Sequence, residues 1–333
     1  MSDEINAGRR RFLTAAAATI ATAQLGIERV MAATGRAGGD LQALETATAW
    51  LNSGPLTAAG LKGKVVLVSF WTYTCINWLR TQPYLRAWAD KYRDRGLVVI
   101  GVHSPEFGFE KNVDRVRRAA QALQVSYPIA VDSEHAIWNA FDNQYWPALY
   151  FIDAKGTIRH RHFGEGQYDR SERTIQQLLG VSGELVSVTG TGREAAADWA
   201  SLQSPESYLG SGRRDNAPEG KLNHWTLSGD WAVGSEAITL RSAGGKIGDR
   251  FHARDLHLVM GPGPTGRPAR FRVRLEGEAP GAAHNLDVDA QGSGQVTEPR
   301  LYQLVRQSPP IADRTFEIEF LDPGVEAFVF TFG

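Results

Sequence analysis

Three short runs of almost uninterrupted apolar residues limit the folds that the first 200 residues of this chain can adopt. The runs cover 64–71, 97–102 and 148–152, and each is bounded by glycine or polar turn residues. Runs of this length and composition are typical of strands buried on both faces of a sheet. Between the first two runs, apolar side chains recur at the spacing of one helix face: Leu85, Trp88, Ala89 and Tyr92. Strands that alternate with amphipathic helices indicate a layered α/β domain.

Further patterns complete this domain. Helical spacing extends over 112–123 and 170–179, and an Asp-Ala-Lys-Gly turn at 153–156 leads into a fourth strand at 157–163. A tight turn between two strands predicts an antiparallel hairpin. We therefore expect a central sheet that is completed by a hairpin and a last helix.

The pattern changes near residue 205. Apolar and charged residues alternate at 271–275 and 316–320, and a strand-like run follows at 326–332; the stretch from 205 holds 10 of the 15 prolines. Many short, half-buried strands with Gly and Pro turns predict a β-sandwich or jelly roll. The predicted organisation is an α/β domain over 40–182, a connector over 183–204 and an all-β domain over 205–333.

The amino terminus is typical of an export signal. Arg9, Arg10 and Arg11 precede Phe-Leu, an uncharged run extends to Ile27, and small residues follow at 31–33. A charged start, a weakly apolar middle and a small-residue end predict a signal peptide over 1–33, and the arginine pair indicates the twin-arginine route. The protein is then periplasmic or extracytoplasmic. The alternative is an alanine-rich amphipathic helix that stays attached.

Charge and composition argue against several functions. The formal net charge is −1, so no basic surface favours nucleic acid or an acidic membrane. No Gly-rich phosphate loop follows a strand, and no Ser-His-Asp set stands out, so no cofactor is predicted. His160 and His162 share one face of a predicted strand, but the arginines around them favour a solvated hairpin, and no metal site is predicted.

The chain has one cysteine, Cys75, which follows the first strand at the point where a helix should begin. A thiol at a helix amino terminus faces unpaired N–H groups that lower its pKa and favour the nucleophilic thiolate. Pro83 falls within that helix and should kink it. His103 follows the second strand at the same sheet edge and is a candidate acid/base neighbour, while Trp146-Pro147 precedes the third strand and suits a cis bond.

These segments together resemble a known family. The motif Phe-Trp-Thr-Tyr-Thr-Cys-Ile-Asn-Trp at 70–78, with Pro83 and Trp146-Pro147, is similar to thioredoxin-like domains of the TlpA/ResA type. The likeness is greatest to the extracytoplasmic part of the DipZ proteins, including 101–107 and, in their carbohydrate-module-like jelly roll, 204–210, 250–257 and 319–324. It spans roughly 40–333. The resemblance implies a thioredoxin fold, thiol–disulfide chemistry at Cys75, and a substrate groove beside Trp71, Trp146 and Pro147.

The chain departs from the family at one decisive position. The family carries Cys-x-x-Cys, and the resolving cysteine is replaced here by Trp78. The buried acid that thioredoxin places before the motif corresponds to Ser69. Three interpretations stay open: Cys75 acts as a monothiol on a disulfide or a peroxide, the scaffold binds extended polypeptide without turnover, or the thiol is buried and inert.

The expected partners follow from these alternatives. They are protein thiols or disulfides, with a membrane thiol-electron donor as a further candidate. The all-β domain is a candidate carbohydrate binder through Trp225, Trp231 and Tyr302, although aromatic side chains in a sandwich usually belong to its core. The rival to a redox enzyme is a non-catalytic periplasmic binding protein in which both domains present surfaces.

Overall fold

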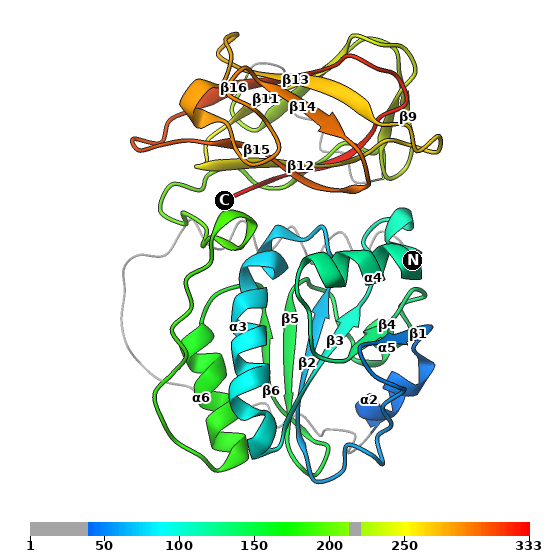
Figure 1. Cartoon of the computed structure of the whole chain (residues 1–333), viewed down its shortest axis with the longest axis vertical. Coiled ribbons are helices and arrows are strands. Elements are labelled where there is room, and N and C mark those ends of the chain that lie inside the picture. The colour runs from blue at the N-terminus through cyan, green and yellow to red at the C-terminus, as the bar shows by residue number, and fades with distance from the viewer. Residues whose placement is uncertain (1–38, 213–220) are drawn as a thin grey trace.

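The computed structural model describes residues 39–212 and 221–333, so the predicted signal peptide lies outside the described residues. Two parts are stacked along the long axis of the molecule (Figure 1). The α/β part, residues 39–180, contains a six-stranded sheet of order β1-β4-β3-β2-β5-β6. Its strands are β1 (Ala49–Leu51), β2 (Val65–Trp71), β3 (Leu97–His103), β4 (Ile129–Val131), β5 (Ala148–Ile152) and β6 (Ile158–Phe163). β2, β3 and β4 are parallel, and β5 and β6 form the predicted antiparallel hairpin.

Helices cover both faces of this sheet. One face carries α3 (Ile76–Tyr92), α4 (Val113–Ala122) and α6 (Tyr168–Leu179), and the other carries α2 (Gly39–Gln42) and α5 (Ala136–Ala140). Short 3₁₀ helices are η1 (Ala43–Thr46), η2 (Arg93–Arg95), η3 (Gly108–Lys111), η4 (Gly192–Glu194) and η5 (Gly281–Ala283). β2 shows why two layers form: Leu67 and Trp71 pack on the α3 side, while Val66 and Phe70 pack on the other. Successive side chains of a strand point to opposite faces, so an all-apolar strand must be covered twice.

The second part, the sandwich (residues 207–333), consists of antiparallel strands in two sheets. One has the order β15-β12-β17-β10-β9, with β7 added to β17, and the other has the order β14-β13-β16-β11-β8. The strands are β7 (Ser207–Tyr208), β8 (His224–Ser228), β9 (Trp231–Val233), β10 (Ile238–Leu240), β11 (Gly245–Phe251), β12 (Asp255–Gly261), β13 (Ala269–Leu275), β14 (Ser293–Val296), β15 (Arg300–Arg306), β16 (Arg314–Phe320) and β17 (Glu326–Phe332). The β-rich second part is thus confirmed, and the jelly-roll topology stays a prediction.

One apolar core fills the space between these two sheets. Leu258 and Phe330 reach it from the first sheet, and Phe271 and Ile318 reach it from the second. Of the aromatic residues considered for sugar contact, Tyr302 is fully buried in this core. Trp225 and Trp231 are half-buried and pack against it. This placement favours a structural role for all three aromatic residues.

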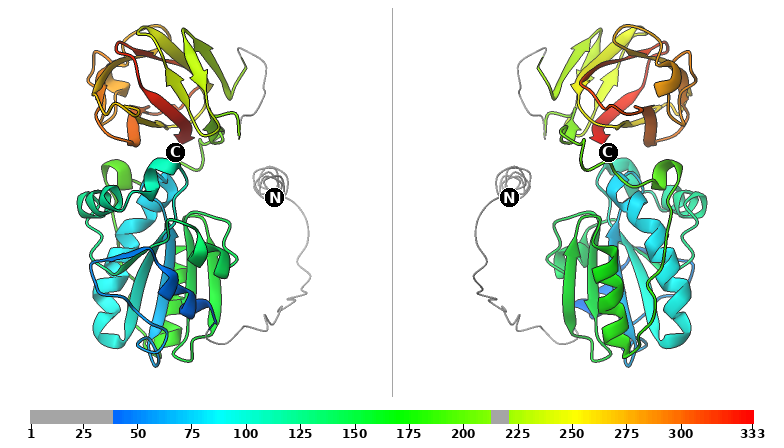
Figure 2. Two further views of the ribbon diagram at one scale, coloured as in Figure 1. Left: turned by 90° about the vertical axis from the view of Figure 1, so that its right-hand side faces the viewer. Right: turned by 90° about the vertical axis from the view of Figure 1, so that its left-hand side faces the viewer.

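The sandwich sits on the edge of the α/β part at which β2 and β3 end (Figures 1 and 2). Val259, Leu301 and Phe328, on the outer face of the sheet that contains β12, β15 and β17, belong to the same apolar cluster as the α3 side of the α/β part. The Phe328 ring lies 5.0 Å from that of Phe107 and 4.9 Å from that of Phe109, centroid to centroid. Aromatic contacts therefore anchor the sandwich beside the loop that follows β3.

The same junction also buries polar side chains. His257 pairs across the strands with Gln303 and with Thr331. Both ring nitrogens of His257, Gln303 Oε1 and Thr331 Oγ1 have no hydrogen-bond partner in the described structure. Burial lowers the pKa of the His257 imidazole to about 3, and the nearby positive charge of Arg80 contributes to this decrease. Part of the junction is therefore apolar and well packed, and part holds polar groups without partners.

Within 39–212 and 221–333, no helix has both the length and the apolar character needed to cross a membrane.

Candidate functional site

Cys75 caps the amino terminus of α3. Its N–H donates to the Thr72 carbonyl oxygen at 3.2 Å, and its own carbonyl accepts from the Leu79 N–H at 3.0 Å, the first turn of the helix. The predicted helix start and the inclusion of Pro83 within the helix are both confirmed. The chain therefore places the thiol beside N–H groups that have no partner within the helix.

The Trp146-Pro147 segment lies at the same edge of the sheet. Phe70 of β2 pairs with Ala148 of β5, so Pro147 falls next to the end of β2, four residues before Cys75. The peptide bond between Trp146 and Pro147 is cis. Trp146 Nε1 donates to the Ser104 carbonyl oxygen at 3.1 Å, which ties this segment to the loop after β3. The topology thus brings together the cysteine and the proline that sequence analysis had linked.

The electrostatic surroundings of Cys75 differ from the expectation. Burial is the largest influence and raises the pKa of the thiol far above its usual range, and the carboxylate of Glu206 raises it further. The N–H groups of Trp78 and Asn77 lower the pKa, as a helix amino terminus should, but the carboxylate of Glu106 opposes them. The expectation of an ionised thiol is therefore wrong for this arrangement, in which Cys75 is a protonated, half-buried thiol.

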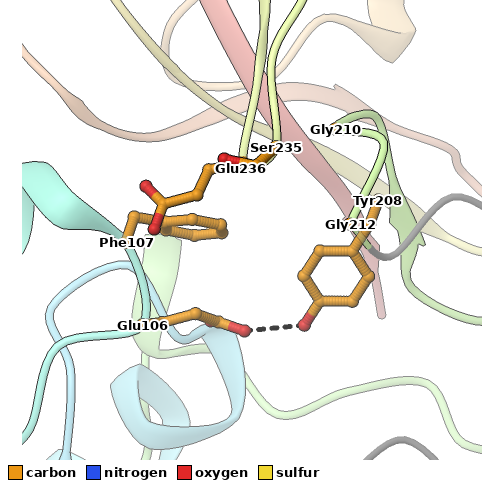
Figure 3. A pocket seen from close by; sticks show the side chains of 7 residues that line it. All are labelled: Glu106, Phe107, Tyr208, Gly210, Gly212, Ser235 and Glu236. Carbon is orange, nitrogen blue, oxygen red and sulfur yellow. Dashed lines mark hydrogen bonds between the residues drawn. The ribbon is translucent and has the colours of Figure 1, made fainter. Parts of the chain in front are cut away.

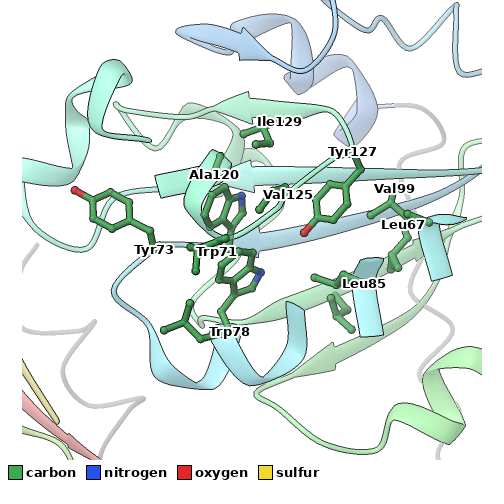
Figure 4. Close-up of a cluster of buried hydrophobic side chains, with 14 of the residues drawn as sticks. Leu67, Trp71, Tyr73, Trp78, Leu85, Val99, Ala120, Val125, Tyr127 and Ile129 are labelled. Carbon is green, nitrogen blue, oxygen red and sulfur yellow. The ribbon is translucent and has the colours of Figure 1, made fainter. Parts of the chain in front are cut away.

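Trp71 and Trp78 form a stacked pair inside the core. Both are fully buried, and their rings lie 4.2 Å apart at an angle of 23° (Figure 4). Gly101 leaves room for Trp71, because a Cβ atom there would lie 2.9 Å from Trp71 Nε1. The expectation that Trp71 lines a substrate groove is wrong, since this side chain reaches no surface. Trp78, at the resolving position, is a core residue.

His103 also belongs to the interior. It is fully buried and lies against Trp71 and Tyr73, with ring centroids 4.9 Å and 5.6 Å away. Burial lowers the pKa of its imidazole to about 3, so the ring is neutral at physiological pH. A base of that strength takes up a proton poorly, and neither ring nitrogen has a hydrogen-bond partner in the described structure. This environment indicates a packing role for His103.

The structure adds a residue that sequence analysis missed. Glu110 is completely buried, and its Oε1 accepts from the Thr74 hydroxyl at 2.6 Å. Its Oε2 accepts from the N–H groups of Glu106 at 2.6 Å and Phe107 at 3.0 Å. The sequence signal was weak: a glutamate three residues after the residue that caps a short helix, which can bond back to that residue's N–H. Glu110 is thus a buried acid that bonds to the residue before Cys75. It comes from the segment after β3, whereas Ser69, the residue that corresponds to the buried acid of thioredoxin, lies in β2.

A cleft of about 260 Å³ opens at the junction next to this loop (Figure 3). Tyr208 from β7 donates its hydroxyl to Glu106 Oε1 at 2.7 Å across the cleft. Glu236 of the sandwich accepts from the Gly108 N–H at 2.9 Å. Polar bonds therefore join the sandwich to the α/β part next to the aromatic anchor. Among the described residues, no group of three or more His, Cys, Asp or Glu side chains is arranged to hold a metal ion.

The buried Glu110 carboxyl predicts a pH-dependent stability. Burial raises its pKa from 4.5 to about 7, against the effect of its hydrogen bonds, with Glu106 adding to the rise. The folded state therefore holds this proton more tightly than the unfolded chain, so the stabilisation is complete below pH 4.5 and is lost as the pH rises through 7.

We expect Glu110→Gln to remove this pH dependence. Relative to the native chain, the variant should gain up to about 3 kcal/mol of unfolding free energy between pH 4 and pH 8. Urea unfolding of the two proteins at the two pH values measures the difference. Parallel pH profiles for the two proteins would contradict the prediction.

Comparison with known proteins places the chain in a family. The AhpC/TSA family matches residues 42–161, and the family described as a thioredoxin-like C-terminal domain matches 215–333. Protein DipZ of Mycobacterium bovis is 36% identical over 257 residues, which cover 69% of this chain and 37% of that protein. The chain thus spans just over a third of the length of DipZ.

Two further relatives match the α/β part. Thiol-disulfide oxidoreductase YkuV of Bacillus subtilis is 34% identical over 132 residues, covering 39% of this chain and 88% of that protein. A solved structure of a thioredoxin-like protein in its oxidised form is 33% identical over 40% of this chain and 89% of its own, with a TM-score of 0.37. With nearly all of YkuV matched, this chain belongs to the thioredoxin-like family of TlpA-type thiol–disulfide oxidoreductases.

Proposed function

We propose that this chain is an exported thioredoxin-like protein whose single thiol, Cys75, exchanges with the disulfides of partner proteins and is resolved by a second, external thiol. The placement of Cys75 at the start of α3, at the sheet edge that also holds the cis Trp146-Pro147 bond, is the observation that carries this proposal. In the proposal, Trp146 and Pro147 hold the partner's backbone beside the sulfur. Family membership supports thiols or disulfides as the reacting groups.

The chemistry balances without a cofactor. The Cys75 thiolate attacks one sulfur of a partner disulfide, an S–S bond forms to Cys75, and the other partner sulfur leaves as thiolate. A second thiol, in place of the missing resolving cysteine, then attacks the partner sulfur of the mixed disulfide and releases Cys75. With a peroxide, the thiolate takes one oxygen to form a sulfenic acid and an alcohol or water leaves; two external thiols then return it to the thiol.

The proposal includes an opening step. In the docked arrangement, burial and the carboxylates of Glu206 and Glu106 hold Cys75 protonated. Glu206 lies beside β7, and Glu106 bonds to Tyr208 of β7, so both charges are fixed there by the docked sandwich. When the sandwich moves away, Cys75 gains water and loses the nearby Glu206 charge, and the N–H groups at the helix start favour its thiolate. The sandwich thus acts as a cover.

The remaining parts of the proposal concern location and organisation. A twin-arginine signal over 1–33 exports the chain. The units are an α/β domain over 40–182, a connector over 183–204 and a sandwich over 205–333. A membrane thiol-electron donor is one source of the second thiol, and carbohydrate is a candidate ligand for the sandwich.

One alternative is favoured by a specific observation. Trp78 fills the resolving position with a buried ring, stacked on Trp71, and the thiol beside it is half-buried and protonated. A thioredoxin-like protein without catalytic turnover needs no resolving cysteine, so a core side chain such as Trp78 can occupy that position. The alternative function is therefore non-catalytic binding of partners or sugars in the periplasm by the two parts together.

Mixed-disulfide formation separates the two functions. Incubation of the full chain at pH 8.5 with oxidised glutathione should add one glutathione to Cys75, as seen by intact mass, and excess free thiol should remove it. Cys75→Ser is the matched control. With hydrogen peroxide instead, a dimedone adduct would identify the peroxide as an oxidant. If Cys75 remains unmodified for hours, both in the native chain and with its cover loosened by Phe328→Ala, the thiol function is excluded and the binding function remains.

A further inference from the structure

We propose that Glu110 is a positioning residue that couples docking of the sandwich to the loop that carries Cys75. The inference rests on the proposed function, since it assumes that the cover controls access to the thiol. It concerns a residue outside the Cys-x-x-Cys motif and outside the cis-proline segment. The contacts of Glu110 form a continuous connection between the thiol and the docking surface.

One side of the connection reaches Cys75. Glu110 Oε1 accepts a hydrogen bond from the hydroxyl of Thr74, the residue that precedes Cys75, at 2.6 Å. Thr74 and Glu110 are both buried, with 2% and 0% exposure. A buried hydrogen bond that water cannot replace fixes the backbone at the residue where the chain turns into α3.

The other side reaches the sandwich. Glu110 Oε2 accepts from the N–H groups of Glu106 and Phe107, so it holds the loop after β3 in one conformation. These same two residues meet the sandwich: Glu106 bonds to the Tyr208 hydroxyl, and the Phe107 ring contacts Phe328. A shift of this loop when the sandwich undocks therefore moves the Glu110 carboxyl group. That movement changes its hydrogen bond to Thr74.

The electrostatics make this connection sensitive. No cation pairs with Glu110 in the described part of the chain, and the carboxyl group is held by hydrogen bonds from Thr74, Glu106 and Phe107. Removal of the carboxyl group leaves two buried N–H groups and a hydroxyl without their acceptor. Glutamine has the same shape: its oxygen can accept from the two N–H groups, and its NH₂ can donate to the Thr74 hydroxyl oxygen. The connection is thus kept in Glu110→Gln and cut in Glu110→Ala.

The test measures how fast iodoacetamide alkylates Cys75 in the folded full chain at a fixed pH. Glu110→Ala should raise the rate about tenfold, which corresponds to about 1.4 kcal/mol of lost coupling. Glu110→Gln should remain within about twofold of the native rate, because it keeps the connection. In a background already opened by Tyr208→Phe and Phe328→Ala, Glu110→Ala should add less than about twofold, because there is no docking left to couple.

Two further variants keep the test decisive. Thr74→Val cuts only the Cys75 side and replaces Glu110→Ala if that variant fails to fold; its effect should likewise vanish in the opened background. Glu172→Gln is the matched control, because Glu172 is also buried and accepts from Tyr92, Lys91 and Trp88 away from Cys75. It should leave the alkylation rate unchanged.

Each outcome has a defined meaning. Rate increases of equal size in the closed and opened backgrounds would overturn the coupling, as would a Glu110→Gln variant that reacts as fast as Glu110→Ala. Failure of the proposed function looks different. Cys75 would then respond to iodoacetamide as predicted but would never form a mixed disulfide with glutathione in any variant.

Discussion

Alkylation of Cys75 should become about ten to a hundred times faster when Phe328 is replaced by alanine and Tyr208 by phenylalanine. The Phe328 ring packs between the rings of Phe107 and Phe109, and truncation of a buried phenylalanine costs about 3–5 kcal/mol. Loss of the Tyr208 hydroxyl removes the bond to Glu106. If about half of this energy stabilises docking, the open population rises by the stated factor, since 1.4 kcal/mol is tenfold.

The polar half of the junction lowers the free-energy cost of such an opening. His257, Gln303 and Thr331 lie in a row across three strands, and each has side-chain atoms without a partner in the described structure. A buried polar group without a hydrogen bond costs about 1–3 kcal/mol, and this cost is recovered when water reaches it. The junction therefore gains stability from its aromatic anchor and loses some at this row, which lowers the net cost of separation.

A control distinguishes opening from general loss of stability. Phe330, on the same strand, packs inside the sandwich core and not against the α/β part. Phe330→Leu should lower the unfolding temperature while leaving the alkylation rate within about twofold of native, because docking is not its contact. Equal acceleration by Phe330→Leu and by the docking variant would show that Cys75 reacts through unfolding, and the cover would lose its support.

Long, regular elements of the fold could be predicted from sequence. β2, β3 and β5 are apolar runs of five to seven residues, and their expected ranges agree with the structure to within one residue. β1 and β4 have three residues each and were missed. Strands this short carry no readable alternation, and they form because neighbouring strands supply the hydrogen bonds.

The candidate site was only partly predictable, because its electrostatics come from residues far apart in the chain. The sequence placed Cys75 at a helix start and Pro147 at the same edge, and both placements depend on local patterns. The high pKa of the thiol comes mainly from burial, and Glu206, which is 131 residues further along the chain beside β7, raises it further. Trp71 was misassigned to a groove because that role was carried over from the resemblance to the family, whereas the side chain is fully buried. Gly101, which gives the Trp71 ring space across the sheet, was the available signal.

Restoring the family's second cysteine by Trp78→Cys should lower the unfolding free energy of the reduced protein by about 3–5 kcal/mol. The Trp78 ring is fully buried and stacked on Trp71, and deletion of an aromatic ring of this size leaves a cavity that its neighbours fill only in part. The loss is a large share of the roughly 5–15 kcal/mol that stabilises a typical domain. Trp78 Nε1 has no partner in the described structure, so removal of this N–H offsets a little of the cost.

Trp78→Ala separates this cavity from the chemistry of the new thiol. The two variants should be similarly unstable when reduced, as measured by urea unfolding, and only Trp78→Cys should form a disulfide with Cys75 and reduce insulin. Insulin reduction should increase further when Phe328→Ala loosens the cover, because the sulfur must meet a protein substrate. A Trp78→Cys protein as stable as the native chain would refute the packing role of Trp78. One that forms the disulfide but never reduces insulin, even with the cover loosened, would mean that more than a resolving thiol separates this chain from its catalytic relatives.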